Sequence, residues 1–311
     1  MSIKDLRIVF LGTPDFAVAS LNALLEAGCN IVGVVTSPDK PAGRGLKLTE
    51  SAVKKYAISK GLHVLQPEKL KNLAFIEELK ALKADIQVVV AFRMLPVIVW
   101  DMPLLGTINV HGSLLPQYRG AAPINWAVIN GEKETGVTTF KLQHEIDTGD
   151  ILMQKVIPIN ENENAGELHD KMMFIGAKTL VDTLKGLING SVQPNNQNES
   201  DIINRAPKIF TETCMIDWNQ TADVIFNLIR GLSPYPTAFT FINDKKLKIF
   251  ASKKEPVGMQ NVQPGKMFTD YKTYLKFSCN DGYILVTDLQ MEGKKRMSSE
   301  EFLRGFREIS I

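Results

Sequence analysis

The chain has 311 residues, 44% of them hydrophobic, which is enough for a large core and predicts two domains. The formal net charge is only +2, which excludes binding through overall charge but leaves room for a local basic face. The three cysteines are scattered and odd in number, which favours reduced thiols and therefore a cytoplasmic protein. Neither the cysteines nor the four histidines have the spacing of metal ligands, so we expect no metal. No apolar run has the length of a signal peptide or a membrane span, so we expect no membrane partner.

The first residues have the pattern of a parallel α/β sheet. Residues 6–12 are nearly all apolar, the turn Gly12–Phe16 leads into a helix, and residues 31–36 supply a second strand. A strand, a helix and a strand within about thirty residues form the βαβ unit of a doubly wound sheet. The turn lacks the second and third glycine of a dinucleotide-binding loop, so the sequence disfavours a nicotinamide oxidoreductase.

The next segment, from Pro38 to Thr49, contains two prolines and two glycines, which predicts a flexible surface loop. Its three cations are Lys40, Arg44 and Lys47, and cations on such a loop can meet the phosphates of a nucleic acid. A solvated loop explains the same three cations equally well, so the residues alone leave both interpretations open.

The α/β pattern then continues with helices over residues 51–60 and 69–83 and a buried strand over residues 85–91. The loop after this strand contains Phe92, Met94 and Leu95. Doubly wound sheets bind ligands at the carboxyl ends of their strands, so this loop is a candidate binding segment.

The residues with the strongest chemical potential lie between Asn109 and Leu152. Asn109 and His111 are two residues apart on an extended segment, so their side chains point to the same side. An amide can donate a hydrogen bond to a developing oxyanion, and an imidazole can transfer a proton near neutral pH. Asp147 can orient the imidazole. This set suits acyl transfer to an amine, although a histidine near a turn is more often structural.

The remaining residues predict a second domain of a different kind. A helix is expected over residues 165–189, and the polar segment 193–204 is the expected linker between domains of residues 1–192 and 205–311. From residue 238 onward, short alternating strands separated by turns predict a small antiparallel barrel. The lysine pair at 245–246 can follow a nucleic-acid backbone, but a solvated barrel surface explains it equally well.

Four motifs together resemble the folate-dependent formyltransferases, and they cover the segments Asn109–Pro116, Tyr118–Ile124, Glu134–Thr138 and Ile146–Leu152. The residues Arg119 to Ile124 (RGAAPI) are most similar to the branch of that family that acts on methionyl-tRNA. The resemblance extends over nearly the whole chain. It implies a Rossmann-like doubly wound parallel sheet in the amino-terminal domain and an OB-like antiparallel β-barrel, a tRNA-binding domain, at the carboxyl terminus.

The resemblance also implies a reaction. The formyl group of 10-formyltetrahydrofolate is expected to pass to the α-amino group of methionyl-initiator tRNA, giving the N-formylmethionyl-tRNA that starts translation. Asn109 and His111 are expected to donate hydrogen bonds to the tetrahedral oxyanion, while Asp147 holds His111 and helps to remove the proton of the amine. A monomer suffices for this chemistry.

Two sets of binding residues follow from the same resemblance. The basic loop with Lys40, Arg44 and Lys47 is expected to contact tRNA. The loop after residue 91 is expected to help hold the pterin ring, although it is one residue shorter here than the commoner family pattern. The expected folate-contacting residues are Ser113, Leu114, Leu115, Pro116, Phe92, Met94 and Leu95.

Three alternative functions remain to be weighed. A formyltransferase for a small amine and a formyltetrahydrofolate hydrolase share the same three catalytic residues, but neither has a use for the basic loop or the carboxyl-terminal barrel. A non-catalytic folate- or RNA-binding module has no use for Asn109, His111 and Asp147 together. The sequence therefore favours transfer to tRNA.

Overall fold

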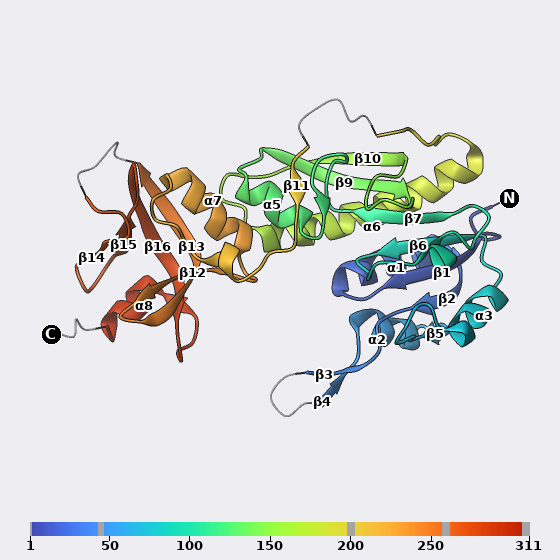
Figure 1. The fold of residues 1–311 in the computed structure, drawn as a ribbon, viewed down its shortest axis with the longest axis horizontal. Coiled ribbons are helices and arrows are strands. Elements are labelled where there is room, and N and C mark those ends of the chain that lie inside the picture. The colour runs from blue at the N-terminus through green and yellow to red at the C-terminus, as the bar shows by residue number, and fades with distance from the viewer. Residues whose placement is uncertain (1, 43–46, 198–202, 257–261, 307–311) are drawn as a thin grey trace. The chain divides into compact units, whose positions relative to one another are not determined.

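The computed structural model describes residues 2–42, 47–197, 203–256 and 262–306 (Figure 1). The chain forms two compact units. The amino-terminal unit comprises Met1–Gly120, Gly136–Ile157 and His169–Arg205, and the carboxyl-terminal unit comprises Ala121–Thr135, Pro158–Leu168 and Ala206–Ile311. Two short segments that precede residue 169 are therefore part of the second unit. The predicted boundaries at residues 192 and 205 stay a prediction.

The amino-terminal unit contains a seven-stranded sheet with the order β10-β9-β7-β6-β1-β2-β5 (Figure 1). The pairs β1–β2, β1–β6, β6–β7 and β2–β5 are parallel, whereas β9 runs antiparallel to β7. The predicted doubly wound sheet is thus confirmed, with an antiparallel addition beyond β7. The strands are β1 Arg7–Gly12, β2 Asn30–Val35, β5 Val64–Leu65, β6 Ile86–Val90, β7 Thr107–His111, β9 Glu134–Lys141 and β10 Ile151–Pro158.

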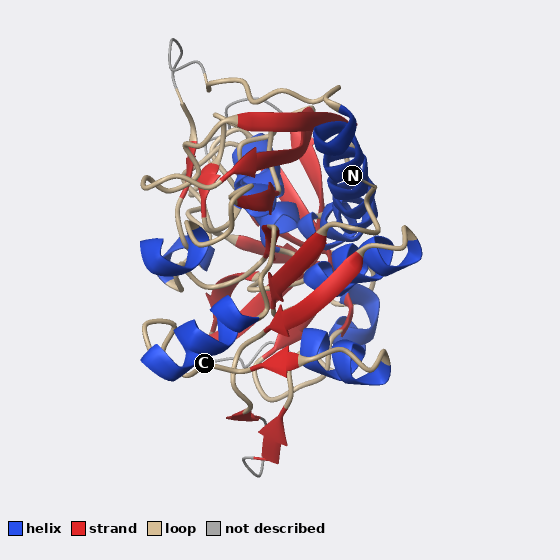
Figure 2. Cartoon of the chain, turned by 90° about the vertical axis from the view of Figure 1, so that its right-hand side faces the viewer, coloured by secondary structure: helices blue, strands red, loops and turns tan. Residues whose placement is uncertain are grey.

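Helices cover both faces of this sheet (Figure 2). Both faces need a cover because alternate residues of a strand point to opposite sides, and the central strands are apolar on both. Val9, Leu11 and Val89 pack in one core cluster with residues of α3 and α4. On the other face, Gly176 of α6 is so close to β7 that a Cβ there would lie 3.3 Å from Val110. The helices that begin before residue 170 are α1 Asp15–Glu26, α2 Ala52–Ser59, α3 Leu73–Ala81, α4 Val97–Trp100, α5 Pro123–Ile129 and α6 Ala165–Asn189.

The segment predicted as a loop between Pro38 and Thr49 is partly regular, so that prediction was incomplete. β3 Lys40–Ala42 and β4 Lys47–Thr49 form an antiparallel ladder that pairs Lys40 with Thr49. Pro41 is tolerated because a two-stranded ladder leaves one side of each strand without a neighbour. The segment is therefore a hairpin.

In the carboxyl-terminal unit, an antiparallel sheet has the order β12-β13-β16-β15-β14, with β17 paired to β16. The sheet curls into a half-barrel, which agrees with the predicted antiparallel barrel class. The β13–β16 register shifts on both sides of Ala251, and such bulges bend a strand. The remaining elements are β8 Arg119–Gly120, β11 Arg205–Ala206, η1 Glu212–Cys214, α7 Ala222–Leu232, β12 Ala238–Ile242, β13 Lys245–Pro256, β14 Met267–Thr269, β15 Leu275–Ser278, β16 Gly282–Met291, β17 Met297–Ser298 and α8 Ser299–Arg304.

Helix α5 belongs to this second unit because it packs tightly on α7. A Cβ at Gly231 would lie 2.5 Å from Ile129 Cγ1 and 2.8 Å from the Ile129 backbone nitrogen, so only glycine permits this approach. The Asn125 side chain donates a hydrogen bond of 2.8 Å to the Gly231 carbonyl. In the part of the chain that the structure describes, no helix has the length and apolar character needed to cross a membrane.

Candidate active site

The three side chains predicted to be catalytic meet beside the carboxyl end of β7. Asn109 and His111 point to the sheet face that carries α3 and α4, because the register pairs Asn109 with Val89 of that core cluster. The loop between β9 and β10 brings Asp147 to the same place, with Oδ2 lying 3.9 Å from His111 Nδ1. The loop that follows β6 starts beside them, since Val90 pairs with Val110.

His111 is nearly buried, with 6% of its surface exposed, and its ring packs edge-on against Phe140. Its Nε2 atom lies 2.9 Å from the carbonyl oxygen of Tyr118. Because a carbonyl oxygen only accepts hydrogen bonds, Nε2 carries the proton that it donates to Tyr118. In the neutral imidazole the lone pair is therefore on Nδ1, the atom that faces Asp147 and that can accept a proton.

Asp147 lies in the left-handed region of backbone conformation, with φ at 57°. Its Oδ2 accepts a hydrogen bond of 2.9 Å from the backbone N–H of Gly120, which fixes the direction of the carboxylate. The 3.9 Å between Oδ2 and His111 Nδ1 is longer than a hydrogen bond. The carboxylate thus faces the ring without a hydrogen bond to it, and it leaves room at Nδ1 for a third group.

The side chain of Asn109 is half-buried on β7. Among the described residues, its amide makes no hydrogen bond to the protein, while its neighbours on the strand lie in the core. A donor held on a rigid strand without a protein partner is available to a ligand. The geometry therefore places one free N–H donor and one imidazole on the same side of β7.

The segment Ser113–Pro116 follows His111 and is held by two side chains that the sequence did not reveal. Thr138 Oγ1 donates a hydrogen bond of 2.7 Å to the Ser113 carbonyl and accepts one of 3.1 Å from the Leu115 backbone N–H. Gln154 Nε2 donates a hydrogen bond of 2.9 Å to the Leu115 carbonyl. The side chains of Ser113 and Leu115 are buried, whereas the two residues that alternate with them are half-buried.

The loop after β6 is fixed by Arg93, which the sequence also did not single out. Its guanidinium donates hydrogen bonds to the backbone carbonyls of Pro67 and Glu68. The group also lies 5.6 Å from the centre of the Phe92 ring, and its partial burial lowers the pKa of Arg93 below the ordinary value. Beside it, Met94 is 75% exposed. The loop therefore presents an apolar surface from a fixed backbone.

Two of the three predicted tRNA-binding residues belong to the hairpin of β3 and β4. Lys40 is exposed on β3, and Lys47 begins β4. Arg44 lies outside the described residues. At the base of the hairpin, Lys54 Nζ donates a hydrogen bond of 2.5 Å to Asp39, and Gln66 Nε2 donates one of 2.8 Å to the same carboxylate. These contacts connect the hairpin to α2 and to the end of β5.

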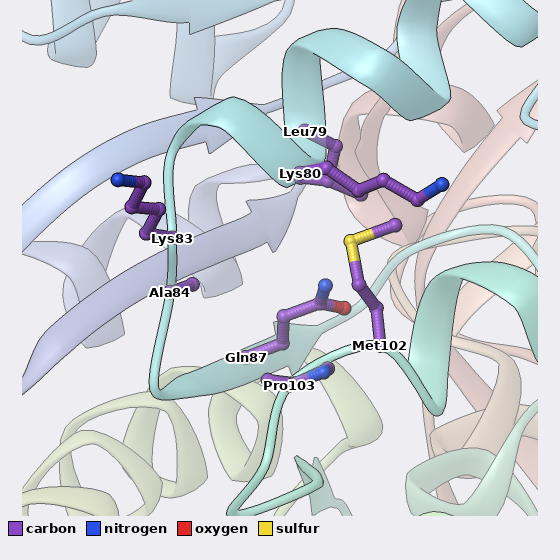
Figure 3. A pocket seen from close by; sticks show the side chains of 7 residues that line it. All are labelled: Leu79, Lys80, Lys83, Ala84, Gln87, Met102 and Pro103. Carbon is purple, nitrogen blue, oxygen red and sulfur yellow. The ribbon is translucent and has the colours of Figure 1, made fainter.

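A separate cavity of about 200 Å³ lies at the opposite end of β6, near Gln87 (Figure 3). The side chains of Lys80 and Lys83 extend to opposite sides of it and do not converge (Figure 3). Because Gln87 is close to the amino-terminal end of β6 and the three predicted catalytic residues are beside the carboxyl ends of the strands, this cavity is not part of the candidate site.

The other histidines do not form a second site. His144 is exposed, and His63 and His169 lie near the carboxylates of Glu78 and Asp170 at 3.4 Å and 3.0 Å. Within the described ranges, no group of three His, Cys, Asp or Glu side chains is arranged to hold a metal ion.

Comparison with known proteins agrees with this geometry. The family model described as "Formyl transferase" matches residues 6–184, and that described as "Formyl transferase, C-terminal domain" matches residues 208–307. Among solved structures, the fold is similar to an N-formyltransferase from Helicobacter canadensis in complex with folinic acid and dTDP-3-aminofucose. The TM-score is 0.69 at 23% identity, and the match covers 90% of this chain and 98% of that one.

Two curated relatives are much more similar in sequence. The methionyl-tRNA formyltransferase of Parabacteroides distasonis is 54% identical, over 100% of this chain and 98% of the relative. The methionyl-tRNA formyltransferase of Phocaeicola vulgatus is 55% identical, over 99% of this chain and 98% of the relative. The chain therefore belongs to the formyl transferase family, and within it to the methionyl-tRNA formyltransferases.

Proposed function

We propose that this chain transfers the formyl group of 10-formyltetrahydrofolate to the α-amino group of methionyl-initiator tRNA, producing N-formylmethionyl-tRNA for translation initiation. The observation that carries the proposal is the arrangement of Asn109, His111 and Asp147 at one place beside the carboxyl end of β7. The relatives with this name provide the substrate class.

Asn109 would stabilise the charge that develops during the reaction. When the amine attacks the formyl carbon, a carbon–nitrogen bond forms and the formyl oxygen becomes negative. The unpartnered Asn109 amide donates a hydrogen bond to this oxygen. Because the donor is already fixed on a strand, little reorganisation is needed, and such a donor typically contributes about 3 kcal/mol to the transition state.

His111 would move the proton. Its Nδ1 accepts the proton that the attacking amine loses, and the resulting imidazolium is stabilised by the carboxylate of Asp147 at 3.9 Å. The same Nδ1–H then returns the proton to the nitrogen of the folate as the bond between that nitrogen and the formyl carbon breaks. One bond forms, one bond breaks and the proton count balances, without a covalent enzyme intermediate.

The surfaces beside these three residues suit a folate. The loop with Phe92, Met94 and Leu95 presents apolar side chains that can pack against an aromatic ring system. In the segment Ser113–Pro116, the half-buried Leu114 and Pro116 and the backbone are accessible. We therefore assign folate contacts to these two segments, and the chemistry needs no metal.

The tRNA contacts would come from both units. Lys40, Arg44 and Lys47 would meet the phosphates of the acceptor arm through the hairpin. In the carboxyl-terminal unit, Lys246 Nζ lies 4.2 Å from the centre of the Phe239 ring, and paired cations and rings suit nucleic acid. In this proposal residues 1–192 carry out catalysis and contribute the hairpin, residues 193–204 are the linker, and residues 205–311 form the tRNA-binding domain. The protein would act as a monomer in the cytoplasm.

The test is the transfer of a labelled formyl group from 10-formyltetrahydrofolate to methionine-charged initiator tRNA. Charged elongator tRNA, free amines and a reaction without acceptor are run beside it, and His111→Ala is the blank. Formylated initiator tRNA that disappears in the variant and decreases with added salt supports the proposal. Release of formate without an acceptor would show a hydrolase, and transfer only to a small amine would show that the hairpin and the half-barrel have another purpose.

A further inference from the structure

We infer that Gln197 is a positioning residue for Asp147, so that a residue of the linker segment controls the rate of formyl transfer. The inference rests on the proposed function, because Asp147 has its role in that reaction. Gln197 belongs to none of the sequence motifs. It lies fifty residues after Asp147 in the chain, yet the two residues are joined by a hydrogen bond.

Asn195 and Gln197 of the linker segment lie directly beside the loop that carries Asp147. Asn195 and Ile151 form an antiparallel bridge, with backbone hydrogen bonds of 2.8 Å and 2.9 Å in both directions. Ile151 is the first residue of β10, and the Asp147 loop ends there. Because Gln197 is only two residues from Asn195, the bridge places Gln197 beside this loop.

Gln197 connects the loop to a nearly buried arginine. Its Nε2 donates hydrogen bonds of 2.9 Å to the Asp147 carbonyl and 2.8 Å to the Gly149 carbonyl. Its Oε1 accepts hydrogen bonds of 3.0 Å and 2.7 Å from Nε and Nη2 of Arg119, which is 4% exposed. Arginine only donates and carbonyls only accept, so this is the one orientation of the amide that satisfies all four hydrogen bonds.

The loop needs these hydrogen bonds because its conformation is strained. Asp147 adopts a φ of 57°, which residues with a side chain rarely do. At Gly149 the backbone passes so close to β9 that a Cβ would lie 1.7 Å from the Lys141 carbonyl oxygen. Without the donated hydrogen bonds, Asp147 can relax toward an ordinary φ, and its carboxylate then leaves its position near His111. A displacement of about 1 Å in a catalytic group can cost about 100-fold in rate.

Two substitutions of nearly the same shape separate this role from others. Gln197→Glu keeps a partner for Arg119 but has no N–H to donate to the loop. Gln197→Met also lacks the donor and, in addition, removes the Oε1 acceptor to which Arg119 donates. Both variants are expected to lower kcat about 10- to 100-fold, with the KM for tRNA unchanged. The matched controls are Gln193→Glu and Gln193→Met, since Gln193 is an exposed residue of the same segment whose side chain, among the described residues, hydrogen bonds only to Gly190.

A double substitution tests whether Gln197 acts through Asp147. If it does, Gln197→Met should have little further effect on kcat in an Asp147→Asn background, because the carboxylate that it positions is already gone. A general structural contribution would instead multiply the two losses. Thermal unfolding of all variants is recorded, and the expected result is that the unfolding temperature of Gln197→Glu stays at that of Gln193→Glu.

The outcomes distinguish the inference from the function on which it rests. A wild-type enzyme that formylates initiator tRNA, slow Gln197 variants, fast Gln193 variants and a non-additive double variant support the inference. A formylating wild type with Gln197 variants as fast as the controls, or with fully multiplicative losses, overturns the inference and leaves the function standing. A wild type that transfers no formyl group to tRNA overturns both.

Discussion

His111 Nε2 donates a hydrogen bond of 2.9 Å to the carbonyl oxygen of Tyr118, and this contact decides which ring nitrogen is left for the proposed chemistry. With Nε2 occupied by a backbone acceptor, only Nδ1 can exchange a proton with a substrate. The backbone of Tyr118 is itself held, since its N–H donates a hydrogen bond of 2.7 Å to the Asn204 carbonyl. The ring is therefore oriented by main-chain atoms rather than by a side chain.

Replacing His111 should remove proton transfer while leaving the fold. His111→Asn retains a side-chain donor but no base, so kcat is expected to fall by about 100- to 10,000-fold, the usual range for general acid–base catalysis. The measurement is kcat for labelled formyl transfer, with the thermal unfolding temperature as a check on the fold. A variant that keeps a tenth of the wild-type rate would show that another group carries the proton.

Replacing Asn109 should affect the transition state and leave stability unchanged. Because the amide has no protein partner among the described residues, its loss breaks no hydrogen bond within the fold. Asn109→Asp, which exchanges the donor for a charged acceptor at constant shape, and Asn109→Ala are both expected to lower kcat by about 100- to 1,000-fold. Unchanged turnover in both would exclude the amide as the donor to the oxyanion.

The base of the hairpin should matter for tRNA and not for folate. A hydrogen bond from Lys54, and to a lesser extent one from Gln66, lowers the pKa of Asp39. The carboxylate therefore stays ionised at neutral pH and becomes protonated only below the pH range in which an ordinary aspartate does. Asp39→Ala removes the half-buried ion pair at the base of β3, and we expect the KM for tRNA to rise by about fivefold.

Steady-state kinetics for both substrates test this prediction. The KM for 10-formyltetrahydrofolate should stay constant in Asp39→Ala. Glu77→Ala, which removes an exposed carboxylate 3.2 Å from Lys80 on α3, is the matched control and should change neither KM. An equal rise in both KM values would show that Asp39 supports the whole site rather than the hairpin.

A carboxylate in the half-barrel should make stability depend on pH. A hydrogen bond from the Thr273 hydroxyl, and next one from its backbone N–H, lower the pKa of Asp270 well below its ordinary value. A lowered pKa in the folded state stabilises the protein above the pKa of the unfolded state, about 3.9, and this contribution is lost as pH falls through the folded value.

Asp270→Asn should therefore lower the urea midpoint of unfolding at pH 7, and the difference from wild type should become smaller at pH 3. Asp244→Asn is the control, since Asp244 lies in a turn of the same sheet and none of its side-chain atoms is hydrogen bonded in the described structure. A difference that grows on acidification would contradict the assigned direction.

The sequence was sufficient for the parts of the site that depend on local pattern. Strand periodicity put Asn109 and His111 on one side of an extended segment, and the structure has both on β7. The helix expected over residues 165–189 has the observed bounds, Ala165–Asn189. Local pattern is informative here because the buried face and the turn residues are determined by near neighbours in the chain.

Residues that act across long separations gave no such signal. Thr138 binds the segment after His111 only because β9 pairs with β7 in a register that sets His111 opposite Thr138. Arg93 and Gln197 hold loops by donating hydrogen bonds to backbone carbonyls. Every residue has a backbone carbonyl, so the type of the accepting residue does not reveal such a contact. The hairpin at β3 and β4 was missed because Pro41 and the glycines favour a loop by local preference.

The passage of the chain between the two units has a consequence for their separability. The backbone crosses from one unit to the other five times, at residues 120, 135, 157, 168 and 205. A fragment that stops at residue 192 would keep Asn125 and Ile129 of α5 but lose Gly231 on α7, the partner of both. A fragment that starts at residue 206 would likewise lack residues 121–135 and 158–168 of its own unit, so no single cut in the chain separates the two units.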